Sequence, residues 1–438
     1  MIARLRQHLA SPALAARLQK LAAGAPAAAP LSLYLPLGAG ERDWLELLAA
    51  NVPFHYRATA ARGEFRLGIG HALQLASSGE HRFAALDNAL AGLCRGWRHE
   101  GETLAFAGFA FAPDGEDCFP NAQLTIPAIT LLSRNGQCAA ILSTPAGRID
   151  EAVGHWRRWL DRLPRRPDFA LPPLLPPLLP PMPETLAIRA FAARCEQALQ
   201  AIASGRLDKL VLSRQRRLLA ATAIPPSAVL APLLAQQPES LVFACGNGQQ
   251  VFLGATPECL VRLAAGQIDA DALAGTAWPG SPQLADDKNR YEQSLVVHAI
   301  CQALTPLCVE APRVAAATAH AAGRLTHLRS LISAQALPDT RLFDLIRALH
   351  PTPAVGGYPA PAALAWLTAH GEERRAWYSG GIGCLDQNGD GEFSVALRSA
   401  LLDGRTAVLQ AGAGLVAGSR VANEVAETEA KFGTMLAA

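Results

Sequence analysis

Two ionisable residues lie in apolar surroundings that would alter their acidity. Lys209 opens the strand-like run LDKLVLSRQ, whose apolar neighbours would desolvate its ammonium and lower its pKa, as a general base requires. Glu258 follows a strand-like run and a turn in VFLGATPECLV, where a carboxyl group near apolar residues stays protonated and donates a proton. The alternative for Lys209 is a solvated lysine at the mouth of a strand. Together the two residues suggest acid–base chemistry.

Glu292 lies on a helix face that the sequence predicts to be buried. In RYEQSLVVHAICQAL it shares that face with apolar residues at helical spacing, namely Leu295, Val296, Ala299 and Ala303. An ionised carboxylate in such a place needs a partner. Stabilisation of the helix N-terminus is an equally good interpretation from position alone.

The last helical stretch, ANEVAETEAKFGTML, places Glu424, Glu427 and Lys431 on one face. Two carboxylates one turn apart repel each other unless a cation lies between them, and either Lys431 or a divalent metal meets that need. An exposed ladder of Glu and Lys is the simpler interpretation of this helix by itself. Taken together, Glu292 and Glu427 supply the one or two carboxylates by which Mg²⁺ is usually held.

Glycines and one arginine mark candidate sites for anionic groups. Gly275 and Thr276 in DALAGT, and Gly412 and Gly414 in LQAGAGLV, are positions where backbone N–H groups approach an anion closely. Arg398 offers a bidentate clamp for a carboxylate.

The stretch DQNGDGEFSVAL, from Asp386 to Leu397, begins like a calcium-binding loop. Such a loop needs a bidentate Glu at its twelfth position, where this chain has Leu397. The N-G-D-G run supplies the residues that a tight hairpin favours. We therefore predict a hairpin turn at this place.

The composition favours an enzyme that acts on a small molecule. Half of the 438 residues are hydrophobic, 17% are charged and the net charge is +2, so we expect no nucleic-acid partner. No apolar run approaches the roughly 20 residues that a membrane span needs, so we expect no membrane association. The nine cysteines are odd in number and form no C-x-x-C pair, which favours reduced thiols and a cytoplasmic location.

Short strand-like runs with turn residues between them predict an antiparallel sheet from residue 31 to 163, with one helix near Phe83 to Trp97. A proline-rich connector occupies 164–184, and the candidate catalytic residues all follow in 185–438. Because hairpins outnumber strand–helix–strand units there, the sequence predicts an α+β fold. The main elements expected beyond the connector are helices at 186–204, 227–236, 288–304, 361–370 and 422–436, and strands at 209–219, 241–245, 250–254, 259–273 and 407–413.

The same residues resemble, in the same order, those of the chorismate-utilising enzymes. The motifs that carry the resemblance are LDKLVLSR, FLGATPECLV, ALAGT, the Glu292 helix, LHPTPAVGGYP, WYSGGIGCLDQNGDGEFSVALRSALL, QAGAGLVAGS and NEVAETEAK, which extend from Lys209 to Lys431. GFAFAPDGEDCFPNAQLTIP resembles a further segment of the family, while the first hundred residues match little. The resemblance implies two large, mostly antiparallel sheets packed face to face with helices outside, forming one intertwined unit. It also implies chorismate, a dianion, as the substrate.

The resemblance assigns a role to each candidate residue. Glu292 and Glu427 resemble the Mg²⁺ ligands that hold the ring carboxylate through the metal, with Glu424 beside them. Gly275, Thr276 and Lys431 would complete that end of the substrate. The residues that match the family's site for the enolpyruvyl carboxylate are Tyr378, Arg398, Gly412 and Gly414.

Within the family, the residues at two positions distinguish the branches by the nucleophile that they use. Branches that attack with an amine have a Gln-like residue in place of Lys209, and the aminodeoxychorismate branch has a nucleophilic Lys where this chain has Ala274. The resemblance therefore implies that water attacks ring carbon C2 with Lys209 as base, while Glu258 protonates the departing C4 hydroxyl. The product would be isochorismate, and an enzyme that consumes it would be the downstream partner.

The stretch HPTPAVGGYP has the isochorismate synthase form, and His350 in it is expected either to line the ring pocket or to serve as a structural histidine. The alternative branch, salicylate synthase, would also eliminate pyruvate. Three residues depart from the family pattern, Ala277, Asn289 and Gln293, and they lie beside the metal site. They leave a weakened enzyme or a non-catalytic chorismate-binding protein as a third interpretation.

Overall fold

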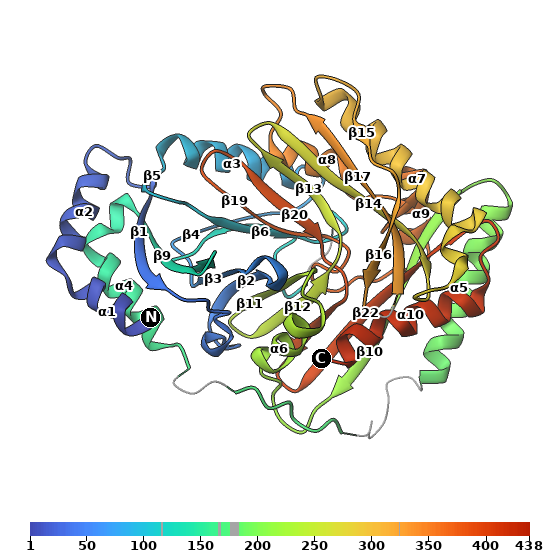
Figure 1. Cartoon of the computed structure of the whole chain (residues 1–438), viewed down its shortest axis with the longest axis horizontal. Helices are drawn as coiled ribbons and strands as arrows, with labels where there is room; N and C mark the ends of the chain where they lie inside the picture. Colours follow the sequence, from blue (N-terminus) through green and yellow to red (C-terminus); the bar gives the residue numbers. More distant parts are fainter. Residues whose placement is uncertain (115–116, 165–167, 176–183, 324) are drawn as a thin grey trace.

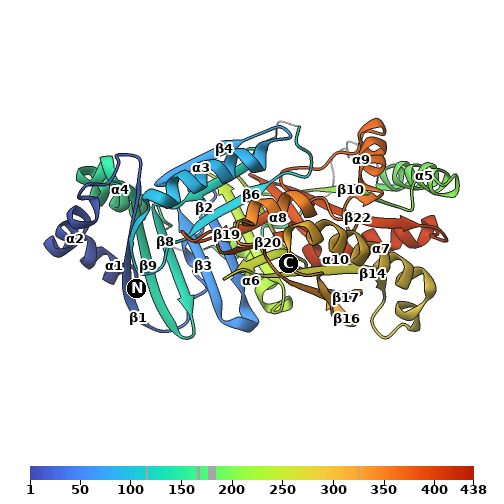
Figure 2. The same ribbon diagram turned by 90° about the horizontal axis from the view of Figure 1, so that it is seen from above.

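The computed structural model describes residues 1–438 apart from 115–116, 165–167, 176–183 and 324. Two large β-sheets pack against each other, and helices cover their outer faces (Figures 1 and 2). The α+β architecture predicted from the sequence is confirmed. Of the predicted proline-rich connector, residues 165–167 and 176–183 lie outside the described residues.

The first sheet has 12 strands within the described residues. In spatial order they are β18 (Gly357–Tyr358), β10 (Lys209–Leu219), β22 (Thr406–Val416), β21 (Ser399–Asp403), β12 (Gln250–Thr256), β11 (Leu241–Asn247), β2 (Pro53–Thr59), β3 (Glu64–Ile69), β8 (Ile129–Arg134), β9 (Gln137–Pro145), β1 (Pro30–Ala39) and β5 (Arg98–Glu100). The pairing of β1 with β5 is parallel and the other pairings described in this sheet are antiparallel.

The second sheet has ten strands within the described residues, and the pairings between them are antiparallel. Its spatial order is β15 (Arg313–Val314), β17 (Leu325–Gln335), β14 (Gln267–Ala277), β13 (Cys259–Ala264), β20 (Gly391–Val395), β19 (Gly381–Leu385), β6 (Ala105–Phe109), β7 (Ala122–Ile126) and β4 (Leu73–Ser77), with β16 (Thr318–Ala322) also on β17. Both sheets thus combine strands from before and after the proline-rich segment.

Helices bury apolar faces against both sheets. Those that contribute to the core beside the first sheet are α1 (Ile2–Ala10), α2 (Pro12–Ala22), α4 (Ile149–Asp161) and α6 (Pro226–Gln236). Those that pack on the second sheet are α3 (Arg82–Gly96), α7 (Asp287–Leu304) and α8 (Leu342–Leu349). Three more lie around β10 and β22, namely α5 (Glu184–Ala203), α9 (Ala360–Ala369) and α10 (Val421–Leu436).

Side chains from the two sheets meet in the interior. The ring of His55 on β2 stacks on that of Phe106 on β6, with centroids 5.3 Å apart. Burial of such apolar and aromatic surface is the main favourable term that holds the sheets together. In the part of the chain that the structure describes, no helix is both long enough and apolar enough to cross a membrane.

The predicted elements of 185–438 agree closely with the observed ones. The five predicted helices correspond to α5, α6, α7, α9 and α10, with ends that differ by one or two residues. The strands predicted near 259–273 are observed as β13 and β14, which are joined by a turn at Ala265 and Gly266, and β14 continues to Ala277. The hairpin is confirmed, because β19 and β20 pair with Leu385 opposite Gly391 and the Asp386 carboxylate accepts the N–H of Asn388.

Candidate active site

A pocket between the two sheets gathers most of the candidate residues. Strands β10 and β22 of the first sheet form one side, and β14 and β17 of the second sheet form another. Of the residues singled out from the sequence, the following line it: Lys209, Glu258, Gly275, Thr276, Glu292, Tyr378, Arg398, Gly412, Gly414, Glu427 and Lys431. Residues 200 apart in the sequence therefore share one cavity.

Lys209 and Glu292 form a buried ion pair in this pocket. The distance between Lys209 Nζ and Glu292 Oε1 is 2.9 Å, and the two side chains are 1% and 9% exposed. Gly414 lies opposite Val211 in the β10–β22 ladder, and a Cβ on Gly414 would lie 2.6 Å from Glu292 Oε1. The missing side chain thus makes room for this carboxylate. The buried face of α7 includes Glu292 and Val296 as predicted, but Leu295 and Ala299 lie at its margin.

Glu258 lies between β12 and β13 and is buried. Burial raises the pKa of its carboxyl group to about 8, and the negative charge of Asp271 adds to the effect, while Lys209 and Lys431 oppose it. Asp271 itself accepts the backbone N–H of Cys259 at 3.2 Å and pairs with Arg329 at 2.9 Å. Glu258 is therefore protonated at neutral pH, as a proton donor must be.

Lys431 and Glu427 form a second ion pair, one turn apart on α10. Lys431 Nζ lies 2.6 Å from Glu427 Oε1 and donates to the carbonyl of Gly412 at 2.7 Å. Lys431 is the foremost of the charges that hold the pKa of Glu427 below its usual range, despite burial. The exposed Glu and Lys ladder considered for this helix is therefore not what forms, since both side chains are less than one fifth exposed.

Glu424 lies beside the pocket rather than in its lining. Its carboxylate is 1% exposed and pairs with Lys288 at 3.1 Å, while its second oxygen, Oε2, is buried without a hydrogen-bond partner among the described residues. The pKa of Glu424 is raised to about 7, chiefly by burial and in addition by the charge of Glu427, while Lys288 opposes the shift. The two carboxylates repel each other, and the charges of Lys288 and Lys431 offset part of that repulsion.

His327 on β17 is a pocket residue that the sequence analysis missed. Its Nδ1 lies 3.1 Å from Thr276 Oγ1, and its Nε2 lies 3.0 Å from Arg398 Nη2. Because Arg398 can only donate, His327 accepts at Nε2 and donates from Nδ1, as the neutral ring does. Burial and the Arg398 charge hold the pKa of His327 well below its usual value. Thr276 Oγ1 then donates to Glu427 at 3.3 Å, which links the arginine clamp to the carboxylate.

The sequence feature that could have identified His327 is its place in the strand-like run LTHLRSLI. Leu325 and His327 share the buried face of β17, so a histidine on an apolar strand face marked the position.

Arg398 is 7% exposed and has a positive φ of 49°, a conformation that non-glycine residues rarely adopt and that often marks functional sites.

A bulge in β14 connects the second sheet to α7. The ladder between β14 and β17 shifts between Ala274 and Thr276, and Gly275 adopts a positive φ of 69°. A Cβ on Gly275 would lie 3.0 Å from the carbonyl oxygen of Asn289. The Asn289 side chain accepts the N–H of Thr276 at 3.2 Å, so the start of α7, and with it Glu292, is fixed to the bulge.

Two of the residues that depart from the family pattern hydrogen-bond to the second sheet, and Gln293 keeps one buried oxygen, Oε1, without a hydrogen-bond partner among the described residues. Asn289 makes the contact just described, and Gln293 donates to the carbonyl of Ala272 at 2.9 Å. Ala277 is buried at the end of β14. The departures therefore leave α7 attached to the second sheet.

Tyr378 and Gly412 lie close together in the pocket. A Cβ on Gly412 would be 3.1 Å from Tyr378 Oη, and burial raises the pKa of this phenol to about 12. The phenol therefore keeps its proton and can donate it to an anion. With Arg398 it supplies the donors expected at the second anion site.

His350 is not brought into the pocket lining. Its ring is buried among Phe83, Phe109 and Phe111, and Nε2 lies 3.0 Å from the carbonyl of Phe111. Burial lowers its pKa to about 3. Of the two roles expected for His350, its position agrees with the structural one, because the neighbouring Ala354 and Val355 line the pocket instead.

The donor set fits a hard divalent cation shared with a ligand. Within the described residues, no three His, Cys, Asp or Glu side chains lie close enough to form a complete protein cage for a metal. Mg²⁺ usually takes only one or two carboxylates and completes its shell with water and anionic ligand oxygens. Glu292 and Glu427 line the pocket as such a pair, whereas Glu424, whose Oε2 is buried without a hydrogen-bond partner among the described residues, lies outside the lining.

Comparison with known proteins shows the family to which this chain is related. The family model described as chorismate binding enzyme matches residues 42–438. The salicylate biosynthesis isochorismate synthase of Pseudomonas aeruginosa is 36% identical over 389 residues, which cover 84% of this chain and 81% of that protein. The isochorismate synthase MenF of Bacillus subtilis is 35% identical over 253 residues, which cover 56% of this chain and 54% of that protein.

Solved structures share the fold. The menaquinone-specific isochorismate synthase MenF of Escherichia coli superposes with a TM-score of 0.77, 23% identity and coverage of 97% of this chain and 98% of that chain. For DhbC of Bacillus anthracis, described as a putative 2,3-dihydroxybenzoate-specific isochorismate synthase, the TM-score is 0.71 at 24% identity, over 90% of this chain and 97% of that chain. With the family model spanning nearly the whole sequence, the chain belongs to the chorismate binding enzyme family.

Proposed function

We propose that this protein is an isochorismate synthase, which converts chorismate to isochorismate. The observation that carries the proposal is the meeting of Lys209 and Glu258 in one pocket, an amine from the first sheet and a protonated carboxyl at the edge of the second. The names of relatives that share 34–36% of their residues with this chain support the same activity.

We propose that Glu292 and Glu427 hold Mg²⁺, with Glu424 beside them. When bound, the ion would neutralise the ring carboxylate of the substrate and fix its position. Lys431 and Thr276 would contact the same end of the substrate, and Arg398 and Tyr378 would bind the enolpyruvyl carboxylate through charge-assisted hydrogen bonds. These assignments divide the two negative groups of the substrate between two ends of the pocket.

The reaction needs one base and one acid on the substrate ring. Lys209, as the neutral amine, accepts a proton from water while the water oxygen bonds to ring carbon C2. The ring double bonds shift, the bond from C4 to its hydroxyl breaks, and Glu258 gives its proton to the departing hydroxyl. One water is consumed and one released. The proton that Lys209 shares with Glu292 must leave before the attack, because only the free amine is a base.

The test is incubation of the protein with chorismate, with and without Mg²⁺, and separation of the products by chromatography. We expect isochorismate, and we expect its formation to stop when a chelator removes the metal. Fluorescent salicylate together with pyruvate would identify a salicylate synthase instead. Binding of chorismate in calorimetry without any product would favour the non-catalytic interpretation.

We also propose that an isochorismate-consuming enzyme acts downstream, since the reaction is reversible and the product must be withdrawn. The relatives' names point to more than one route, because one is named for salicylate biosynthesis and another for menaquinone. Adding a lyase that removes isochorismate should raise the yield of the coupled reaction. No change in yield would contradict the proposed reversibility.

A further inference from the structure

The loop of residues 350–356, which leads into β18, forms part of the pocket wall through Ala354 and Val355. We propose that Arg374, oriented by Glu372, is a positioning residue that clamps this loop to β10 and thereby sets the width of the substrate pocket. Neither residue was singled out from the sequence, and neither lines the pocket itself. The inference rests on the proposed function, because it concerns how the site for chorismate is held in shape.

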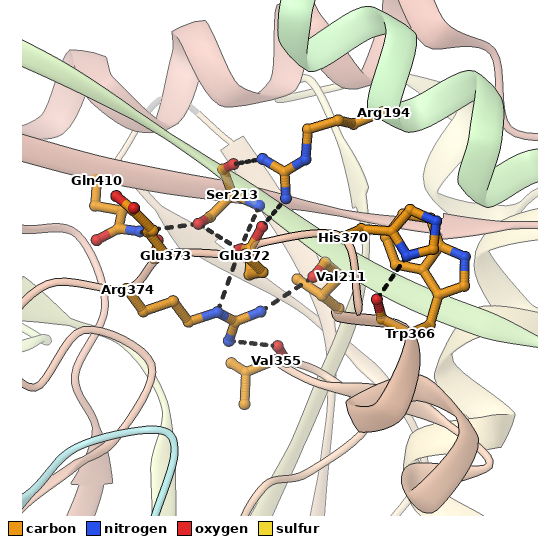
Figure 3. A network of polar contacts seen from close by, with 10 residues as sticks. All are labelled: Arg194, Val211, Ser213, Val355, Trp366, His370, Glu372, Glu373, Arg374 and Gln410. Carbon is orange, nitrogen blue, oxygen red and sulfur yellow. Dashed lines mark hydrogen bonds and ion pairs between the residues drawn. The ribbon is translucent and has the colours of Figure 1, made fainter. Parts of the chain in front are cut away.

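The guanidinium of Arg374 joins two residues of the pocket wall. Nη1 donates to the carbonyl of Val355 at 2.8 Å, and Nη2 donates to the carbonyl of Val211 at 3.0 Å (Figure 3). Val211 lies on β10 two residues beyond Lys209, on the same face of the strand. Arg374 therefore ties the loop to the strand that carries the proposed base.

Glu372 holds the guanidinium in the orientation that this contact needs. Its Oε1 accepts from Arg374 Nε at 3.3 Å, from Ser213 Oγ at 2.6 Å and from Ser213 N at 3.0 Å, and Oε2 pairs with Arg194 on α5 (Figure 3). The side chains of Glu372 and Arg374 are 3% and 4% exposed. Every nitrogen of the Arg374 guanidinium thus has an acceptor, and the charge is buried with its counter-ion.

The same network reaches the segment that bears Tyr378. Gln410, a pocket residue on β22, donates to Ser213 Oγ at 2.9 Å and to the carbonyl of Glu373 at 2.6 Å (Figure 3). Its own carbonyl accepts the N–H of Arg375 at 3.0 Å. The segment from 372 to 375 is therefore attached to both β10 and β22, and Tyr378 follows three residues later.

The loop is also held at its beginning, through His350. The ring of His350 contacts the carbonyl of Phe111, and the guanidinium carbon of Arg374 lies 3.7 Å from the centroid of the Phe111 ring. The beginning of this stretch is thus attached to Phe111 through His350 and its middle to β10 through Arg374, while its end continues into β18, which pairs with β10. This explains why a histidine from the motif HPTP contributes to the site without lining it.

The geometry requires an arginine. The planar guanidinium presents donors in three directions at once, here toward one carboxylate and two carbonyls, while a lysine ammonium at the end of a flexible stem does not span the same acceptors. Arg374→Lys keeps the charge and loses the clamp. Arg374→Ala removes both and leaves a space that guanidinium ion fits.

The test compares the kinetics of Arg374→Lys and Arg374→Ala with those of Arg57→Lys, in the full chain with Mg²⁺. Arg57 is a matched control, because it also is a buried arginine with a carboxylate and two backbone carbonyls as acceptors, and it lies outside this pocket. We expect KM for chorismate to rise on the order of 10- to 100-fold in both Arg374 variants, with a smaller fall in kcat. Added guanidinium chloride at low millimolar concentration should lower KM again for Arg374→Ala only.

Unchanged KM in Arg374→Lys, with a loss of thermal stability equal to that of Arg57→Lys, would overturn the proposal and leave Arg374 as a stabilising residue only. Should Arg374→Ala fail to fold, Glu372→Gln provides the test, since it removes the charge that orients the guanidinium and should raise KM by a smaller factor. If the wild-type protein forms no isochorismate, the proposed function fails. The positioning role is then decided by the Kd for chorismate from calorimetry, which must be weaker in Arg374→Lys than in the wild type.

Discussion

Two ion pairs between elements of this protein, each with a buried cation, look alike and differ in what they can do. Lys209 Nζ lies 2.9 Å from Glu292, and Arg57 Nη2 lies 2.8 Å from Glu392. Arg57 also donates to the carbonyls of Ile382 and Glu392, so its charge is held by fixed acceptors. A guanidinium never loses its proton in a protein, whereas an amine does. Only the lysine pair is therefore able to supply a base.

The cavities beside these two ion pairs also differ in whether their ionisable groups can exchange protons. Arg57 borders a cavity of about 530 Å³ between the sheets, lined by several arginines and carboxylates that largely pair with one another, such as Arg134 with Glu102. The pocket around Lys209 is smaller, but it combines a buried amine with two carboxyl groups whose pKa values shift in opposite directions, upward for Glu258 and downward for Glu427. Opposed pKa values, rather than cavity size, distinguish a site of acid–base chemistry.

The strongest test of this comparison is Lys209→Ala. We expect kcat to fall by roughly 10³-fold or more, because the general base is removed. Chorismate binding should remain largely intact, since Lys209 acts on water and not on the charges of the substrate. Kinetics and calorimetry on the same preparation measure both, with Arg57→Lys as the control that keeps kcat. Turnover that survives in Lys209→Ala would assign the base to another group.

Glu427→Gln should produce the next largest effect. It removes the charge of one proposed Mg²⁺ ligand, so affinity for Mg²⁺ and for chorismate should weaken together by about tenfold or more. Calorimetric titration of the metal, followed by chorismate, measures the two affinities separately. Glu392→Gln, which alters the carboxylate beside Arg57, should change neither of them. A variant at Glu427 with normal metal affinity would contradict the proposed metal site.

The pH dependence of kcat/KM tests whether Glu258 is the proton donor. A proton donor with a pKa of about 8 is competent below that pH, so kcat/KM should fall as the pH rises through about 8. The negative charge of Asp271 raises this pKa, so Asp271→Asn should move the fall to lower pH. Glu392→Gln again serves as the control with an unchanged profile. If the fall in kcat/KM occurs at the same pH in Asp271→Asn as in the wild type, the fall does not report the ionisation of Glu258.

The smallest effect on catalysis is expected at Arg57. Arg57→Lys should lower the free energy of unfolding by about 1–3 kcal/mol, because carbonyl acceptors lose their buried donor. KM and kcat should stay within twofold of the wild-type values. A twofold change corresponds to about 0.4 kcal/mol of binding or activation free energy. Denaturant unfolding and steady-state kinetics test the two statements. A large rise in KM would mean that the two ion pairs are coupled.

Local patterns predicted much of this molecule. The helices and strands that follow the proline-rich segment, the hairpin at 386–391 and the burial of Glu292 on α7 all depend on periodicity and turn residues that act over a few positions. The resemblance to a known family assigned the roles of eleven residues that the pocket brings together. The motifs were informative because each one places a residue at a definite point on a strand, helix or turn.

Tertiary structure alone decided the partners of those residues. Periodicity states which face of an element is buried, and it does not state which distant element covers that face. Hence His327 was not recognised as the link between Arg398 and Thr276, and His350 was not assigned to Phe111. The pairing of β10 with β22 joins segments about 200 residues apart, and long-range contacts of this kind convert separate charged residues into one site.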